Sequence, residues 1–294
     1  MELIFPLATL NDVEIEDQFI SSETNIAAPQ HPTPDDPPWG LFEGIALWAA
    51  SVLAILLIPG LFLLPYLTRL DPPITQTDAL IEFAKTDPTS IFIQIAAIIP
   101  AHILTLLMAW LIVTRMRKFS FPRTLGWDNG GFRWWYYVVI LSIFFAIAAL
   151  VGNFFPEQEN DLTRMLQSSR SVVYIVAFIA TFTAPIVEEV VYRGVLYSAF
   201  QRVLGVPTAF VIVTFMFAVV HVPQYYPSFP TIFLLTLLSL ILTGIRVRTG
   251  NLLPCIILHT VFNALQSVFL LLEPVITKSG STDNAATFLH LLKY

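Results

Sequence analysis

Long apolar runs, separated by short polar segments, dominate the pattern of this chain. Seven of them are predicted to cross a membrane, because a helix of about 20 mainly apolar residues spans the hydrocarbon core of a bilayer. The predicted spans are residues 44–67, 91–114, 134–155, 171–204, 207–222, 232–247 and 252–272. The pattern therefore predicts an all-α fold, a polytopic bundle of about seven transmembrane helices.

The spans divide the chain into four expected parts. The N-terminal part has no Lys or Arg and is rich in proline and acidic residues, which predicts a solvated, poorly ordered tail. The four parts are that tail at 1–43, N-terminal spans at 44–170, a membrane core at 171–273 and a C-terminal tail at 274–294. Within the core, the span 171–204 is expected to be one long helix that only Pro185 interrupts.

Composition supports a membrane protein. Hydrophobic residues make up 56% of the 294 residues and charged residues only 12%, whereas soluble domains contain about 25% charged residues. The bilayer is therefore an expected partner, and the location is the cell membrane if the organism is bacterial. The net charge of −6 and the scattered basic residues exclude a nucleic-acid partner. The single cysteine, Cys255, excludes an internal disulfide and a cysteine-cluster zinc site.

The loop after the second span predicts the orientation of the bundle. It contains an excess of basic residues, namely Arg115, Arg117, Lys118, Arg123 and Arg133. Such an excess is typical of cytoplasmic loops. The N-terminus is therefore expected in the cytoplasm.

Five polar residues inside apolar spans are the candidates for chemistry. Charged or titratable groups at membrane depth are costly and normally face a protein-lined or water-filled cavity, where they act in catalysis or transport. The five are Glu188, Glu189, His221, His259 and Asn263. His102 also lies in a span, but it has no partner at helical spacing and is interpreted as structural.

Helix geometry assigns different roles to the two adjacent glutamates. Glu189 and Arg193 are four positions apart, so they share a helix face and are predicted to form a structural ion pair. Glu188 points about 100° away and has no cation at helical spacing. A buried carboxylate without an ion pair can exchange protons near neutral pH. Glu188 is therefore the predicted general base.

The same geometry predicts that the histidines meet Glu188. Gly205 and Pro207 mark a tight turn, and Glu188 and His221 lie at nearly equal sequence distances on either side of it. An antiparallel hairpin would place the two side chains at similar depth. On the last span, His259 and Asn263 are four positions apart and face one way. We expect these polar ends to converge on one cavity, with Glu189 turned aside toward Arg193.

These residue types are suited to amide hydrolysis. A carboxylate can deprotonate water, and imidazole and carboxamide N–H groups can stabilise the oxyanion of the tetrahedral intermediate. A second hypothesis is a zinc site formed by Glu188, His221 and His259, since one carboxylate and two imidazoles can be catalytic zinc ligands. The HExxH motif of many zinc proteases is absent, and the metal-free mechanism without a cofactor is preferred.

Three motifs over residues 171–270 resemble those of the CPBP family, which comprises type II CAAX prenyl endopeptidases and bacteriocin-processing intramembrane proteases and includes the Ras-converting enzyme. The matching residues are Glu188, Glu189 and Arg193, then Phe217 and His221, then His259 and Asn263. The resemblance implies an all-α membrane bundle, water activation by Glu188, and a reaction centre completed by His221, His259 and Asn263. Glu189, Arg193 and Phe217 are expected to support it.

The sequence thus predicts an intramembrane endopeptidase, and the resemblance implies that its substrates are prenylated CAAX-type proteins or other membrane-associated peptides. Two alternatives from other classes remain at this point. One is a non-catalytic membrane scaffold or bacteriocin-immunity factor that binds a peptide in the same cavity. The other is a proton-linked transporter, which the lack of inverted repeats disfavours.

Overall fold

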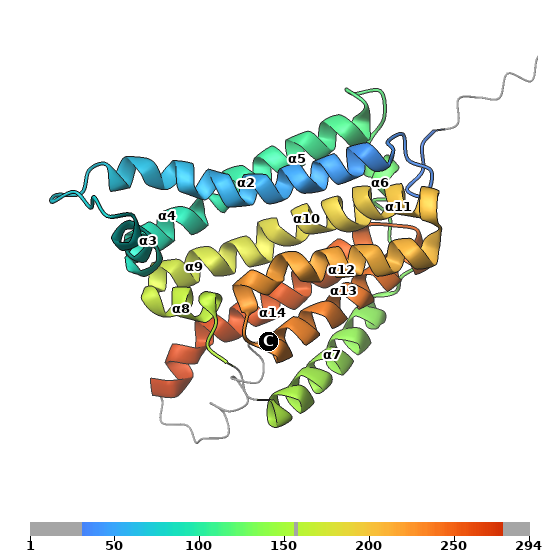
Figure 1. Ribbon diagram of the computed structural model, residues 1–294. Coiled ribbons are helices and arrows are strands. Elements are labelled where there is room, and N and C mark those ends of the chain that lie inside the picture. Colours follow the sequence, from blue (N-terminus) through green and yellow to red (C-terminus); the bar gives the residue numbers. More distant parts are fainter. Residues whose placement is uncertain (1–30, 156–157, 279–294) are drawn as a thin grey trace, which may run out of the picture. The chain divides into compact units, whose positions relative to one another are not determined.

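The computed structural model describes residues 31–155 and 158–278, and the architecture below is that of the unit beginning at Pro32. Every regular element in the described residues is a helix (Figure 1). Seven segments are long and apolar enough to cross a membrane: Leu41–Leu67, Pro88–Thr114, Trp134–Phe154, Arg170–Leu204, Val206–Tyr225, Phe229–Thr249 and Leu253–Leu272. The predicted all-α polytopic bundle is confirmed, and the predicted bounds differ from these by only a few residues.

Two of the spans consist of more than one element. The second combines α4 (Pro88–Ala96) and α5 (Ile98–Thr114), and the fourth combines α9 (Arg170–Phe178), η1 (Ile179–Thr183), α10 (Ala184–Glu189), η2 (Val190–Leu196) and α11 (Tyr197–Leu204). The remaining spans are α2 (Leu41–Leu67), α7 (Trp134–Phe154), α12 (Val206–Tyr225), α13 (Phe229–Thr249) and α14 (Leu253–Lys278). Short helices in the connections, α3 (Thr77–Thr86), α6 (Phe121–Leu125) and α8 (Asp161–Ser168), were not predicted.

The fourth span contains two π-helical segments, η1 and η2, where the sequence predicted only a break at Pro185. The N–H of Ala184 donates to the carbonyl of Ile179, which is the π register. In this register the donor to the Ala180 carbonyl would be residue 185, but proline has no N–H. The Ala180 carbonyl is therefore left for a side-chain donor.

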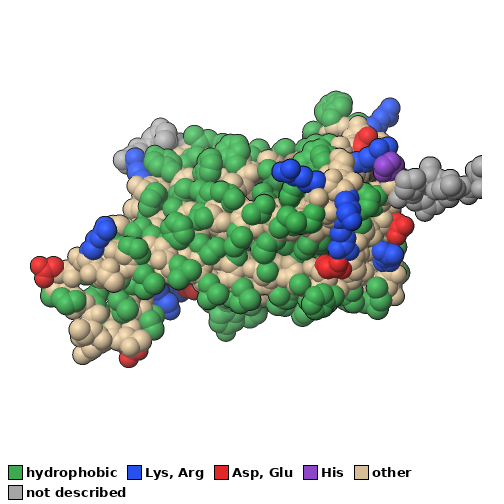
Figure 2. Space-filling view, turned by 90° about the horizontal axis from the view of Figure 1, so that it is seen from above, with side chains coloured by type: hydrophobic (Ala, Val, Ile, Leu, Met, Phe, Trp, Pro, Cys, Tyr) green, Lys and Arg blue, Asp and Glu red, His purple; other side chains and the backbone are tan. Residues whose placement is uncertain are grey.

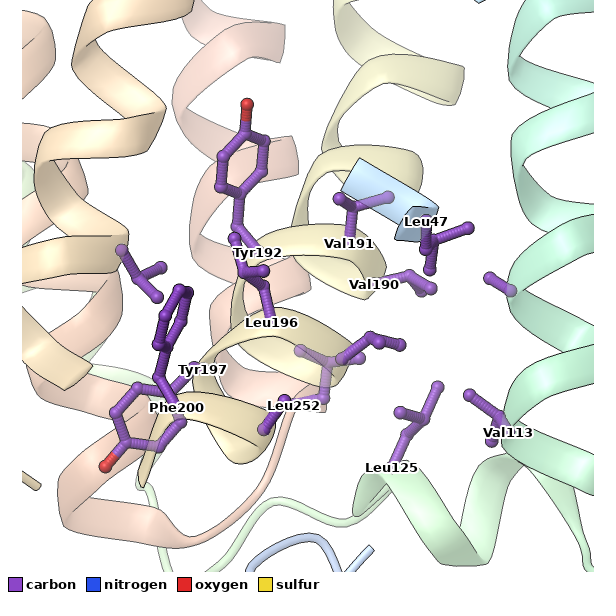
Figure 3. Packing of buried hydrophobic residues seen from close by; sticks show 14 of the residues in the cluster. Leu47, Val113, Leu125, Val190, Val191, Tyr192, Leu196, Tyr197, Phe200 and Leu252 are labelled. Atoms are coloured by element: carbon purple, nitrogen blue, oxygen red, sulfur yellow. The ribbon is translucent and has the colours of Figure 1, made fainter. Parts of the chain in front are cut away.

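The second π segment, η2, lies in the largest cluster of buried residues. All of its residues are buried. It contacts α2, α5 and α6, and Figure 3 shows Val190 and Val191 beside Leu47 of α2. A Cβ atom at Gly194 would lie 3.1 Å from the Leu125 side chain. Close packing of this kind, rather than water exclusion, holds helices together in a bilayer. It fixes the helix that holds Glu188 and Glu189.

The segment before the first span differs from the predicted tail. Residues 1–30 lie outside the described part, but the backbone from Pro32 onward is held against the bundle. The Trp39 side chain is buried and its indole N–H donates to the carbonyl of Val195 at 3.0 Å. Arg202 donates to the carbonyl of Pro37 at 2.9 Å, and Arg115 donates to that of Pro38. The proline-rich composition indicated disorder, whereas these contacts order the segment.

At the C-terminus, α14 continues to Lys278, past the predicted end of the core at 273. The rest of the predicted C-terminal tail lies outside the described residues.

Charged side chains lie mostly toward the ends of the face shown in Figure 2, with hydrophobic side chains over its middle. The C-terminal ends of α5, α11 and α13 and the N-terminal ends of α2, α7 and α14 lie together (Figure 1). The basic residues Arg115, Arg202 and Arg246 therefore share one end of the bundle. This arrangement agrees with the loop that predicted the cytoplasmic side, and the orientation itself stays a prediction.

Candidate active site

Three spans supply the candidate residues. The span that contains α10 and η2 supplies Glu188, Glu189 and Arg193, while α12 supplies Phe217 and His221, and α14 supplies His259 and Asn263. These spans pack against one another, with α10 in contact with α14 and η2 in contact with α12. Their assembly is why residues far apart in sequence can share one site.

Glu189 is the buried centre of the cluster. Its side chain is 0% exposed, and its Oε1 accepts hydrogen bonds from Arg193 Nη1 at 3.0 Å and from His259 Nδ1 at 2.8 Å. The Arg193 guanidinium also donates to Ser239 Oγ at 2.8 Å and lies 4.5 Å from the centroid of the Phe217 ring. The predicted ion pair of Glu189 and Arg193 is confirmed. Glu189 is not turned aside from the site, however, because the same oxygen also binds His259.

Glu188 and His259 face each other across a short gap. The Nδ1–H group of His259 donates a hydrogen bond to Glu189, so the opposite ring nitrogen, Nε2, is directed toward Glu188. Nε2 lies 3.8 Å from Glu188 Oε2. This distance exceeds a hydrogen bond. The Glu188 side chain is 22% exposed, so Glu188 is accessible from outside the core while Glu189 is not. The adjacent acids therefore have the different environments that the helix geometry predicted.

His221 joins the cluster through Phe217. Its Nδ1 donates to the backbone carbonyl of Phe217 at 2.7 Å, which leaves Nε2 as the free ring nitrogen. The Phe217 ring lies 4.7 Å from the His221 ring and 6.3 Å from the His259 ring, measured between centroids. It also contacts the Tyr192 ring at 5.1 Å. Phe217 thus contacts both imidazole rings.

Asn263 fills the gap that Pro185 leaves in the backbone hydrogen bonding. Its Nδ2 donates to the carbonyl of Ala180 at 2.8 Å, the carbonyl that the π register and the proline leave without a backbone donor. A carboxamide has two N–H donors, so one remains for another acceptor. The Asn263 side chain is half-buried. Its hydrogen bond to η1 depends on the π register there, which sequence spacing did not show.

His102 is a neighbour of the site that the sequence did not assign to it. Its side chain is buried on α5. The Thr183 hydroxyl donates to the carbonyl of Ile179 at 3.3 Å, so the Thr183 oxygen accepts from His102 Nδ1 at 2.9 Å. Thr183 directly precedes α10, the helix that contains Glu188 and Glu189. No helical spacing indicated this role, because the partner lies on another span.

The polar cluster does not match the geometry of a metal centre. Within the part of the chain that the structure describes, no group of three His, Cys, Asp or Glu side chains is placed to hold a metal ion. The zinc set of Glu188, His221 and His259 is not among such groups, and the metal-free mechanism stays a prediction. Glu189 binds the Nδ1 side of His259.

Comparison with known proteins addresses the family. Residues 170–265 match the model of the family described as type II CAAX prenyl endopeptidase Rce1-like. No curated protein and no solved structure matches the chain. The matched residues contain every motif of the cluster. The match confirms the resemblance to the CPBP family over these residues, and the seven membrane-length helices support an integral membrane protein.

Proposed function

We propose that this protein is an intramembrane endopeptidase in which Glu188 activates the water that hydrolyses a peptide bond. The observation that supports this most is the pair of adjacent glutamates in different environments. Glu189 is fully buried and bound to Arg193 and His259, whereas Glu188 is partly exposed and lies 3.8 Å from His259 Nε2. A carboxylate that is accessible and not held by a guanidinium is free to take a proton from water.

The residues around Glu188 are suited to the later steps. Water oxygen bonds to the carbonyl carbon while its proton passes to Glu188, and the carbonyl oxygen becomes the oxyanion. When His259 is protonated on both nitrogens, its Nε2–H is a donor beside Glu188, and the second N–H of Asn263 is another donor for this charge. The C–N bond then breaks as the proton passes from Glu188 to the leaving amine, giving a carboxylic acid and a free amine.

His221 is proposed as the third polar group of the reaction centre. Its Nδ1 is held by Phe217, so its free Nε2 can accept a hydrogen bond from the attacking water and orient it. The substrates proposed from the family are prenylated CAAX-type proteins or other membrane-associated peptides. No metal or cofactor is part of this mechanism.

Replacement of Glu188 tests the function in cells. Membrane peptides would be compared, by mass spectrometry of their C-termini, between cells that contain the intact protein and cells that contain Glu188→Gln at the same level. The intact protein should generate shortened peptides whose longer precursors accumulate in the variant. Identical peptide pools, together with an unchanged biological effect of the variant, would instead favour a non-catalytic membrane scaffold.

A further inference from the structure

Arg246 is a buried arginine near the end of α13 whose counter-charge comes from the segment before the first span. Its side chain is 1% exposed, its Nη2 lies 2.9 Å from Asp35 Oδ1, and the same nitrogen donates to the carbonyl of Pro34 at 2.8 Å. Its Nη1 is buried and has no hydrogen-bond partner among the described residues. Within that part of the chain, Asp35 is the only carboxylate that forms an ion pair with Arg246.

Arg246 is also connected to the candidate active site. Its Nε donates to the backbone carbonyl of Arg193 at 3.2 Å. Arg193 binds Glu189 at 3.0 Å, and Glu189 accepts from His259 at 2.8 Å. A continuous series of contacts thus runs from Asp35 through Arg246, Arg193 and Glu189 to His259.

The series contains two carboxylates, Asp35 and Glu189, and two guanidinium groups, Arg246 and Arg193, so its charges balance. Glu189 is the only buried carboxylate among the described residues, and its Oε2 has no hydrogen-bond partner there. A buried cation that loses its counter-charge is strongly unfavourable. Without Asp35, two buried guanidinium groups would compete for Glu189, because charges interact strongly in a low-dielectric interior.

We propose that Asp35 is a positioning residue for the active site. Acting through Arg246 and Arg193, it keeps the Glu189 carboxylate on His259 Nδ1, and thereby keeps Nε2 directed toward Glu188. Its effect on cleavage rests on the function proposed above, whereas its effect on the His259 ring does not. Asp35 lies outside residues 170–265, which match the family model.

The next residue, Asp36, provides a matched control. Asp36 pairs with Arg202 at 3.7 Å, and both side chains are mostly exposed, at 70% and 52%. Surface ion pairs of this kind contribute little. Asp36→Asn therefore makes the same change of net charge at the neighbouring residue, but it leaves the buried series of contacts intact.

The experiment compares full-length Asp35→Asn, Asp36→Asn and Asp35→Glu, purified in detergent with ¹⁵N-labelled histidine. The ring-nitrogen shifts of His259, assigned with His259→Gln, are measured by NMR, and kcat and KM are measured on a cleaved peptide. Asp35→Asn should move both His259 ring shifts and lower kcat roughly 10- to 100-fold with KM unchanged, because the reacting groups are misplaced. Asp36→Asn should leave both as they are. Asp35→Glu should keep the native His259 shifts and kcat, because it retains the carboxylate. The Asp35 side chain is 54% exposed and leaves room for a longer side chain.

Unchanged His259 shifts in folded Asp35→Asn would overturn the proposal, as would a lower melting temperature with normal shifts and kcat. Should Asp35→Asn not fold, Arg246→Lys decides the question. Lysine keeps the charge but loses the guanidinium bond to the Arg193 carbonyl, so the His259 shifts should still move. A native protein that cleaves nothing would count against the proposed function alone, because the NMR comparison does not depend on cleavage.

Discussion

Glu188 and Glu189 are adjacent in sequence, yet each has a different physical task. Glu189 is enclosed by protein, and one of its oxygens accepts from both a guanidinium and an imidazole. Its charge is needed where it is, because a buried arginine beside it would otherwise be uncompensated. Glu188 keeps partial access to its surroundings. Substitution by glutamine, which preserves shape and removes charge, separates the two tasks.

We predict that Glu189→Gln destabilises the protein and Glu188→Gln does not. Loss of the Glu189 charge leaves Arg193 buried without its partner, which costs about 3–5 kcal/mol. Glu188→Gln should retain the native melting temperature but lower kcat about 100- to 10,000-fold, as expected for removal of a general base. Thermal unfolding in detergent and initial cleavage rates measure the two effects. Full activity of Glu188→Gln would remove Glu188 from the mechanism.

A second prediction at this scale concerns metal. Because the described side chains do not assemble a three-ligand site, purified protein treated exhaustively with a chelator should keep its cleavage rate. Elemental analysis of the same sample should find no stoichiometric zinc. Loss of activity that one added divalent ion restores would support the zinc hypothesis for Glu188, His221 and His259 instead.

At the scale of elements, the contact between η1 and α14 shows how a backbone irregularity is stabilised. The π register and Pro185 leave the Ala180 carbonyl without a backbone donor, and Asn263 donates to it. One turn further along α14, the Ser267 hydroxyl accepts from Thr181 at 3.0 Å and contacts the Ala177 carbonyl at 3.4 Å. Asn263 of α14 therefore replaces a hydrogen bond that a regular α-helix would make within itself, and Ser267 adds a second contact.

We predict that Asn263→Ala and Ser267→Ala lower stability alike but differ in activity. Each leaves a partly buried polar group on η1 without its partner, at a cost of about 1–3 kcal/mol. Of the two, only Asn263 is proposed as an oxyanion donor, and loss of such a donor lowers kcat about 100- to 1,000-fold. The melting temperature and kcat of the two purified variants test this. Equal kcat values in both variants would assign Asn263 to structure alone.

At the scale of the whole molecule, the basic residues at one end of the bundle predict which end faces the cytoplasm. Lys118 follows α5 at this end, and Asp78 lies on α3 at the opposite end (Figure 1). Both side chains are exposed. The native Cys255 is buried and should react little with a polar maleimide, so introduced cysteines can report the orientation.

We predict that Lys118→Cys is labelled only from the cytoplasmic side of sealed vesicles and Asp78→Cys only from the other side. The physical reason is the preference of Lys and Arg for cytoplasmic loops. A membrane-impermeant maleimide, applied to vesicles of both orientations, gives the measurement. The reverse labelling pattern would place the N-terminal segment and the Asp35 contact outside the cytoplasm.

The sequence alone determined the class of fold and the pairs of residues that share a helix face. Membrane-length apolar runs leave little choice but helices, because every backbone group must be bonded within its own segment in a bilayer. Spacing of four residues likewise predicted the contact of Glu189 with Arg193, which the structure confirms. These features are local, so they can be read from neighbouring positions.

Only the tertiary structure decided how residues from different segments meet. The bond of His259 to Glu189, that of Asn263 to the Ala180 carbonyl and that of His102 to Thr183 each join two spans. Likewise, Asp35 is held by Arg246 although its surroundings in the sequence indicated a disordered tail. Such contacts depend on how the helices are turned and where π segments shift their register. Hydrophobic periodicity reports which residues share a face, but it does not report what that face meets.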